Sequence, residues 1–208
     1  MTPFLYPQSK HRRTQAPPAY IKYQNYKPYL RQEFSAKCVY CCYPDGIKGA
    51  DSFGVDHYRP KSKFPEFETH YPNLFYACNC CNRRKGNFWP TPAEDQLGSF
   101  VPNPCDHVMF THMRYRGAIV EPRTKTGRFA VKLLLLNDDE SVGQRETVNV
   151  AIKSIQEIHV RQSKTLAAIE SRLNEYPNDV QLLQEKEKNE ERLHKLERSL
   201  ARLGVPNS

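Results

Sequence analysis

Two cysteine pairs constrain the fold of this chain more than any other feature of its sequence. Cys38 and Cys41 are separated by two residues, as are Cys78 and Cys81. A pair at this spacing spans one tight turn and directs both sulfurs to a single ion, and two such pairs are typical of a structural tetrahedral zinc site. We expect a zinc ion to hold the two pairs together as a clip, with the segment between them folded against it.

The sequence also indicates where the protein acts. It contains no run of about 18 apolar residues, so we expect no membrane span. The N-terminus is basic and proline-rich without an apolar stretch, which is unlike a secretory signal. The predicted location is therefore the cytoplasm.

The composition favours a metal-stapled domain over a large hydrophobic core. Only 38% of the 208 residues are apolar, and a small core often requires a metal ion or disulfides for stability. In a reducing compartment, the seven cysteines are expected to be metal thiolates more often than disulfides. Cys42 and Cys80 lie beside the two pairs, so another choice of four ligands stays open.

The whole chain has a net charge of +8, and the positive charge is concentrated in its first part. Residues 1–37 carry seven lysines and arginines against one acid, whereas residues 141–208 carry eleven against ten. Basic charge before and within the cysteine region favours a polyanionic partner there, and nucleic acid is the expected one.

The pattern of apolar residues and helix breakers predicts an α+β fold in three parts. Residues 1–37 indicate a basic arm and a helix over 19–34 that begins or kinks at Pro28. Residues 38–136 form the predicted zinc-stapled domain, and residues 137–208 form a helical hairpin.

Within the central part, alternating apolar residues predict strands over residues 53–58 and 73–77, followed by a helix over residues 78–85. A further strand pair is expected around residues 117–120 and 127–135. The central part should therefore hold a small ββα core at its cysteine end.

A regular seam predicts two long antiparallel helices in the C-terminal part. Its positions follow a 4-3-4-3 spacing and are mostly apolar: Val148, Ile152, Ile155, His159, Gln162, Leu166, Ile169 and Leu173. The segment Tyr176–Asp179 interrupts the seam, and a second helix carrying leucines follows it. We expect this hairpin to dock with a second copy of the chain or with a partner helix, and simple packing against the nuclease domain stays open as an equal alternative.

Asp56, His57, Asn73 and Asn82 form a second pattern, whose chemistry suits phosphodiester hydrolysis. The reaction needs a water nucleophile, a base to take its proton and a cation to stabilise charge on the phosphate. His57 suits the base because its pKa lies near neutrality, and Asn73 is placed to fix the imidazole orientation. Asp56 and the amide oxygen of Asn82 are hard ligands suited to Mg²⁺ or Mn²⁺. Because adjacent strand residues point to opposite faces, the pattern also requires a bend near His57.

Four segments carry these residues in order: Cys38-Val-Tyr-Cys41, Val55-Asp-His-Tyr-Arg-Pro-Lys-Ser62, Tyr71-Pro-Asn-Leu74 and Ala77-Cys-Asn-Cys-Cys-Asn-Arg-Arg-Lys85. Together they resemble an HNH endonuclease, a class with a ββα-metal core that often carries two zinc-binding cysteine pairs. The resemblance implies that His57 is the general base, Asn73 the middle Asn and Asp56 the acidic metal ligand. Asn82 stands where the family has its final His or Asn, which suggests use of Mg²⁺. The implied products carry a 5′-phosphate and a 3′-hydroxyl.

Basic side chains follow the final metal ligand on the same predicted helix. We expect at least one of Arg83, Arg84 and Lys85 to contact phosphate, with Lys61 as a further candidate. Phosphate contacts do not report on the sugar, so these residues do not separate DNA from RNA. We favour DNA as the substrate.

A further likeness concerns the PtuB-like HNH nucleases of Septu-type antiphage systems. It rests on the tyrosine-rich N-terminal helix, on Pro60-Lys-Ser62, and on Leu134-Leu-Leu-Asn137 followed by Arg145. This resemblance implies an effector nuclease that acts with an ABC-type ATPase. Two alternatives stay open: an RNA-cleaving nuclease on the same core, and a noncatalytic zinc module that binds nucleic acid or a partner protein.

Overall fold

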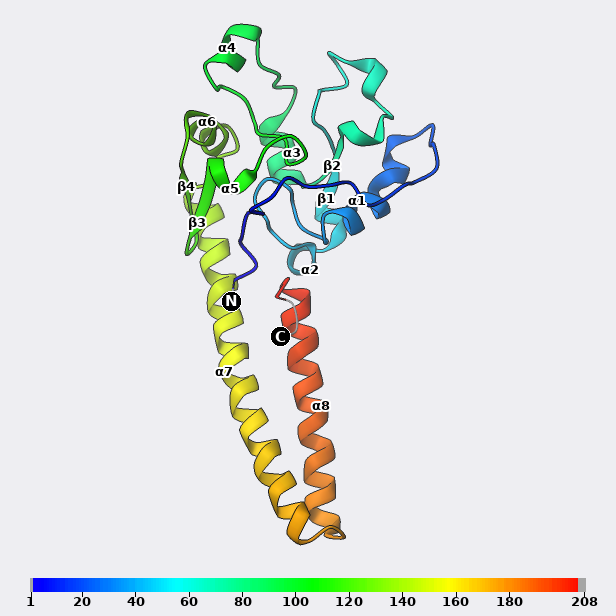
Figure 1. Ribbon diagram of the computed structural model, residues 1–208, viewed down its shortest axis with the longest axis vertical. Coiled ribbons are helices and arrows are strands. Elements are labelled where there is room, and N and C mark those ends of the chain that lie inside the picture. Colours follow the sequence, from blue (N-terminus) through cyan, green and yellow to red (C-terminus); the bar gives the residue numbers. More distant parts are fainter. Residues whose placement is uncertain (1, 206–208) are drawn as a thin grey trace. The chain divides into compact units, whose positions relative to one another are not determined.

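The computed structural model describes residues 2–205 of the chain (Figure 1). Pro3–Glu146 forms one compact unit, and the residues from Thr147 onward belong to a second. The basic arm and first helix therefore share a unit with the cysteine region, and the C-terminal unit begins later than the expected boundary at residue 137. No helix within residues 2–205 has the length and apolar character needed to cross a bilayer.

A two-stranded sheet and the helix that follows it form the centre of the first unit. Strand β1 (Phe53–His57) pairs antiparallel with β2 (Leu74–Cys78), in a register from Phe53↔Cys78 to His57↔Leu74. Helix α3 (Asn79–Lys85) begins at the end of β2, where the sulfur of Cys78 caps it by accepting a hydrogen bond from the amide of Cys81. The predicted α+β class with a ββα core is confirmed.

The N-terminal residues 3–18 form a strap that the buried side chains of Phe4 and Tyr6 anchor to the first unit, although residues 7–18 are exposed or half-buried. The side chains of Phe4 and Tyr6 are buried, and the hydroxyl of Tyr6 donates a hydrogen bond to the carbonyl of Tyr40 at 2.7 Å. A 3₁₀ turn, η1 (Tyr23–Tyr26), leads into helix α1 (Lys27–Glu33). Helix α1 begins at Lys27 and has Pro28 in its first turn, a position that favours proline, so the helix predicted over residues 19–34 starts close to Pro28 and does not extend back to residue 19.

Short turns and helices connect these elements: α2 (Asp45–Lys48), η2 (Ala50–Ser52), η3 (Pro65–Phe67), η4 (Tyr71–Asn73), α4 (Pro92–Gln96) and α5 (Met109–His112). Helix α4 interrupts the proline-rich segment because Thr91 and Glu94 cap its start reciprocally, as a capping box.

The segment beyond α5 differs from the sequence prediction. Strands β3 (Met113–Arg116) and β4 (Ile119–Pro122) pair as a hairpin, but α6 (Lys125–Leu133) is a helix where we predicted a strand. The side chain of Thr124 caps this helix by accepting a hydrogen bond from the amide of Gly127 at 3.0 Å. A Cβ atom at Gly127 would lie 2.0 Å from the carbonyl oxygen of His112, so only glycine allows α6 to pack there.

The second unit contains the predicted hairpin of long helices. Helix α7 (Asp139–Glu175) runs from the first unit into the second, and α8 (Val180–Arg202) follows it. Asp179 caps α8 by accepting hydrogen bonds from the amides of Gln181 and Leu182. Ion pairs between Lys186 and Glu170 and between His159 and Glu197 join the two helices. All eight predicted seam positions of α7 are buried or half-buried.

Candidate active site and zinc clip

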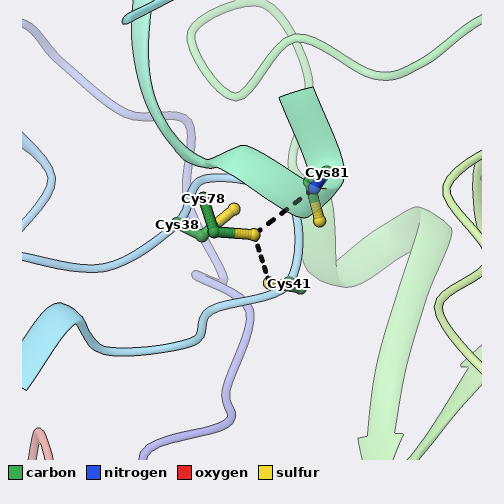
Figure 2. Close-up of side chains that lie close together, drawn as sticks. All are labelled: Cys38, Cys41, Cys78 and Cys81. Atoms are coloured by element: carbon green, nitrogen blue, oxygen red, sulfur yellow. Dashed lines mark hydrogen bonds between the residues drawn. The ribbon is translucent and has the colours of Figure 1, made fainter. Parts of the chain in front are cut away.

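The four predicted zinc ligands meet at the start of α3. The sulfur atoms of Cys38, Cys41, Cys78 and Cys81 lie within 4.8 Å of one another, and all four residues are buried. Figure 2 shows the sulfur of Cys78 directed toward Cys41, 3.8 Å away. Four sulfurs at about 2.3 Å from a central zinc ion would be about 3.8 Å apart. The geometry and the donor set therefore fit a tetrahedral zinc ion.

Electrostatics within the clip favour a bound cation. Hydrogen bonds from the other three thiols lower the pKa of Cys78. Burial is the main reason that the pKa of Cys38 is raised. Four buried sulfurs cannot all lose their protons unless a cation compensates their charge. The neighbouring Cys42 is not part of the group: its thiol donates to the carbonyl of Leu5 at 3.3 Å, and burial raises its pKa to about 12.

His57, the predicted base, ends strand β1 with a fixed imidazole. Its Nε2 atom lies 2.9 Å from the carbonyl oxygen of Glu68, and its ring packs edge-on against Tyr23 with centroids 4.6 Å apart. A carbonyl oxygen only accepts, so Nε2 carries the proton and Nδ1 keeps its lone pair. Burial lowers the pKa of His57. The ring is thus held neutral near pH 7 with one nitrogen ready to accept a proton.

Asn73 fixes the loop that follows His57 instead of bonding to its ring. Its Oδ1 accepts a hydrogen bond from the amide of Arg59 at 2.8 Å, and its Nδ2 donates to the carbonyls of Arg59 and Phe67. The oriented acceptor for the imidazole is the carbonyl of Glu68, one residue beyond Phe67. Asn73 therefore acts on His57 through the loop, one step further away than we expected.

Asp56 is buried in a network of its own. Its Oδ2 accepts a hydrogen bond from the hydroxyl of Tyr40 at 2.5 Å, and its Oδ1 lies 3.1 Å from the ammonium of Lys85. Lys85 also donates to the carbonyl of His57 at 2.7 Å, and both charged side chains are 2% exposed. The strand stays regular up to His57↔Leu74, so the expected bend is absent and Asp56 and His57 point to opposite faces.

Asn82 lies on α3 beside β1. Its Nδ2 donates a hydrogen bond to the carbonyl of Val55 at 3.4 Å, and its Oδ1 accepts none from the described residues. Apart from the zinc clip, no group of three or more His, Cys, Asp or Glu side chains within residues 2–205 could hold a metal ion. The amide oxygen of Asn82 is therefore one oxygen atom next to strand β1 that is available as a metal ligand.

The four basic residues that we expected at phosphate occupy different environments. Lys85 is buried against Asp56, and Arg84 pairs with Asp138 and donates to the carbonyls of Leu134 and Leu135. Arg83 is exposed and makes no ion pair with any residue that the structure describes. The ammonium of Lys61 is exposed, 2.9 Å from Glu68 and 4.7 Å from the ring centroid of Tyr23. Only Arg83 and Lys61 are thus placed at the surface.

Glu33 has a role in the site that no sequence motif indicates. Its buried carboxylate accepts hydrogen bonds from the amides of Thr14 and Gln15 and from the hydroxyl of Tyr71, and it pairs with His11. Burial raises its pKa, but these hydrogen bonds outweigh that effect and the pKa is lowered. Glu33 therefore ties the N-terminal strap to the loop that carries Asn73. A lone acid in an amphipathic helix gives no sequence signal for this role.

Comparisons with known proteins agree with this geometry. Residues 38–88, about a quarter of the chain, match the family model of the HNH endonuclease. Septu protein PtuB from Bacillus thuringiensis is 27% identical over 103 residues, which cover 47% of this chain and 39% of that protein. The chain thus spans about two-fifths of the length of this relative. No solved structure matches. The segment that holds the clip, His57, Asn73 and Asn82 therefore matches the HNH endonuclease family model, as its motifs indicated.

Proposed function

We propose that this protein is a metal-dependent HNH endonuclease that hydrolyses phosphodiester bonds, with His57 as its general base. The observation that carries the proposal is the fixed tautomer of His57. A histidine that serves only to fill a core has no need for a free, oriented Nδ1 atom. The zinc clip supports the same conclusion because it holds α3 against β1, which keeps Asn82 beside the strand that bears His57.

In the proposed reaction, Nδ1 of His57 accepts a proton from a water molecule as the water oxygen attacks phosphorus. The bond between phosphorus and the 3′ oxygen breaks, and that oxygen takes a proton from solvent. The products are a 5′-phosphate and a 3′-hydroxyl. The lowered pKa of His57 keeps the base unprotonated at physiological pH, and the Glu68 carbonyl stabilises the imidazolium that forms.

The oxygen atoms beside β1 are of the type that binds a hard divalent ion, but one of them is engaged by a lysine in this structure. Asp56 and the Oδ1 of Asn82 are carboxylate and amide oxygens, which Mg²⁺ and Mn²⁺ prefer. The ammonium of Lys85 lies against Asp56 in this structure, so Asp56 would join an ion only if that ammonium withdrew. When bound, the ion would stabilise negative charge on the phosphate and leaving oxygen. The proposed ligands remain Asp56 and Asn82, and Asp56 would reach an ion on the side of His57 only if the strand also bent there.

The substrate and the biological role are also proposals. We favour DNA over RNA, with Arg83 and Lys61 as the surface contacts to phosphate, and a role as the effector nuclease of a cytoplasmic antiphage defence system. The likeness to Septu protein PtuB supports this role. An ABC-type ATPase is the proposed partner, and the hairpin α7–α8 is its proposed docking element or a self-association surface.

Cleavage by the wild-type protein and by His57→Ala tests the proposal. Each protein, loaded with zinc and with its ATPase partner present, is incubated with supercoiled plasmid or RNA in Mg²⁺, Mn²⁺ or EDTA. His194→Ala on α8 provides a matched control at an exposed histidine. We expect cutting of plasmid by wild type and His194→Ala in either metal, and none by His57→Ala or in EDTA. Cleavage that survives His57→Ala would refute the base assignment. No cleavage of either substrate by wild type would favour the noncatalytic zinc module.

A further inference from the structure

A cleft opens beside the loop that orients His57. It lies within the first unit, between the loop from Tyr58 to Asn73 and the segment from Trp89 to Asp106, and its volume is ≈ 630 Å³. Binding sites for small ligands usually enclose about 300–1,000 Å³. The cleft is thus large enough for one nucleotide, and nothing in the reaction proposed above uses it.

Flat side chains line much of this cleft. Tyr58, Phe67, Trp89 and Phe100 all contribute to its wall, and each is half-buried, with part of its surface left uncovered. The Trp89 ring is held in place by edge-on packing against Tyr58, with centroids 5.6 Å apart. Exposed, immobilised rings are the surfaces on which nucleobases stack.

The charged groups of the cleft can bind a phosphate and hydrogen-bond donors of a base. The guanidinium of Arg59 lies 5.3 Å from the ring centroid of Trp89 and 5.1 Å from that of Phe67. Its N–H groups donate to no acceptor among residues 2–205, so they are available to a phosphate. Asp95 and Asp106 bring carboxylates to the cleft. Asp106 accepts one hydrogen bond, from Asn103 at 2.8 Å, and an ionised carboxylate has further acceptor capacity.

The carboxylates select among bases because they only accept hydrogen bonds. Guanine presents an imino and an amino donor side by side, which one carboxylate can accept together. Thymine and uracil present a single imino donor between two carbonyl oxygens, which the carboxylates repel. Access to these edges and to a ring face requires a base outside a duplex stack.

The cleft and the proposed base share one loop. Asn73 and Phe67 line the cleft, Asn73 bonds to the backbone of Phe67, and the next residue, Glu68, accepts the hydrogen bond from His57. The cleft therefore adjoins the loop that orients His57.

We propose that this cleft binds one unpaired nucleotide of the substrate, guanine in preference to thymine or uracil, with the base stacked on the aromatic wall, its donors on Asp95 and Asp106, and a phosphate on Arg59. This inference rests on the proposed nuclease function and adds a substrate class to it: single-stranded or locally opened nucleic acid.

Trp89 is the single tryptophan of the chain, so its fluorescence reports on the cleft directly and without cleavage. The zinc-loaded full-length protein is titrated with guanosine monophosphate, thymidine monophosphate and ribose 5-phosphate, with free tryptophan amide as the inner-filter control. We expect saturable quenching by guanosine monophosphate, binding that is about tenfold weaker for thymidine monophosphate, and no quenching by ribose 5-phosphate. Equal responses to all three compounds, or no response to guanosine monophosphate, would overturn the proposal.

Two variants separate this site from the reaction. Asp106→Asn should reduce the preference for guanine while zinc content and circular dichroism stay unchanged, whereas Glu66→Gln, an exposed acid outside the cleft, should leave it intact. An unchanged preference in Asp106→Asn would contradict the assigned role of that carboxylate. His57→Ala should bind guanosine monophosphate as wild type does. If guanosine monophosphate binds but cleavage does not depend on His57, the cleft assignment stands and the nuclease assignment falls. If cleavage depends on His57 but guanosine monophosphate does not bind, the nuclease assignment stands and the cleft assignment falls.

Discussion

The ion pair between Lys85 and Asp56 provides the sharpest test of how the core is built. Lys85→Met keeps the aliphatic length of the side chain but removes its ammonium, which donates to Asp56 and to the carbonyl of His57. Both partners of the pair are 2% exposed, so Asp56 would remain buried with Tyr40 as its hydrogen-bond donor. Removing one partner of a buried ion pair costs about 3–5 kcal/mol. We expect a decrease of that size in the unfolding free energy.

Lys61→Met is the matched control because Lys61 also pairs with a carboxylate, that of Glu68 at 2.9 Å, but at the surface. An exposed pair contributes about 0–1 kcal/mol. Urea unfolding followed by Trp89 fluorescence, at a constant free zinc concentration, measures both variants. The double variant Lys85→Met with Asp56→Asn should lose less than the sum of the single losses, because neither buried charge is then left alone. A loss for Lys85→Met no larger than that for Lys61→Met would refute the buried-pair account.

Further predictions concern the clip, the strap and the loop. Cys38→Ser should lose bound zinc and stability together, whereas Cys42→Ser should keep its zinc; metal analysis after dialysis distinguishes them, and full zinc in Cys38→Ser would show the ligand set to be wrong. Because the pKa of Glu33 is lowered in the folded state, its ionised carboxylate stabilises the fold above the ordinary value of 4.5, and this effect is lost as the pH falls through the lower, folded-state pKa. Glu33→Gln should therefore weaken the decrease of unfolding free energy at acid pH. An unchanged decrease would show that Glu33 does not hold the strap. Asn73→Ala should cost about 1–3 kcal/mol of stability and reduce cleavage, while a variant with wild-type stability and rate would show that Asn73 does not hold the loop.

Features formed by residues close together in the sequence were mostly predictable. The spacing of Cys38, Cys41, Cys78 and Cys81 was sufficient for the clip because a short turn allows few other arrangements of the sulfurs. The strands and helix around His57 followed from the short apolar segments on either side of it and from the helix predicted over residues 78–85. Residues 125–133 were mispredicted because a short apolar run fits a strand or a helix equally well, and the cap at Thr124 decides between them.

Contacts between distant segments were not predictable in the same way. The sequence indicated only a basic arm at the N-terminus, yet Phe4 and Tyr6 are buried, and no periodic pattern marks them. The imidazole of His57 is oriented by the backbone carbonyl of Glu68. Because every residue type has such a carbonyl, the amino acid at position 68 could not predict this hydrogen bond. Lys85 was expected to contact phosphate because it follows Asn82, but its side chain turns inward to Asp56. Sequence neighbours on a short helix point to different faces, and only tertiary packing shows which face is buried.

The pH dependence of single-turnover cleavage tests the role of His57 most directly. Burial lowers the pKa of His57 from its ordinary value of 6.5, and a base must be unprotonated to act. We predict a rate that rises with pH through an inflection below 6.5 and is level above it, with the inflection at the same pH in Mg²⁺ and in Mn²⁺. An inflection that moves with the metal, or that persists in the residual activity of His57→Ala, would contradict the assignment of His57 as the general base.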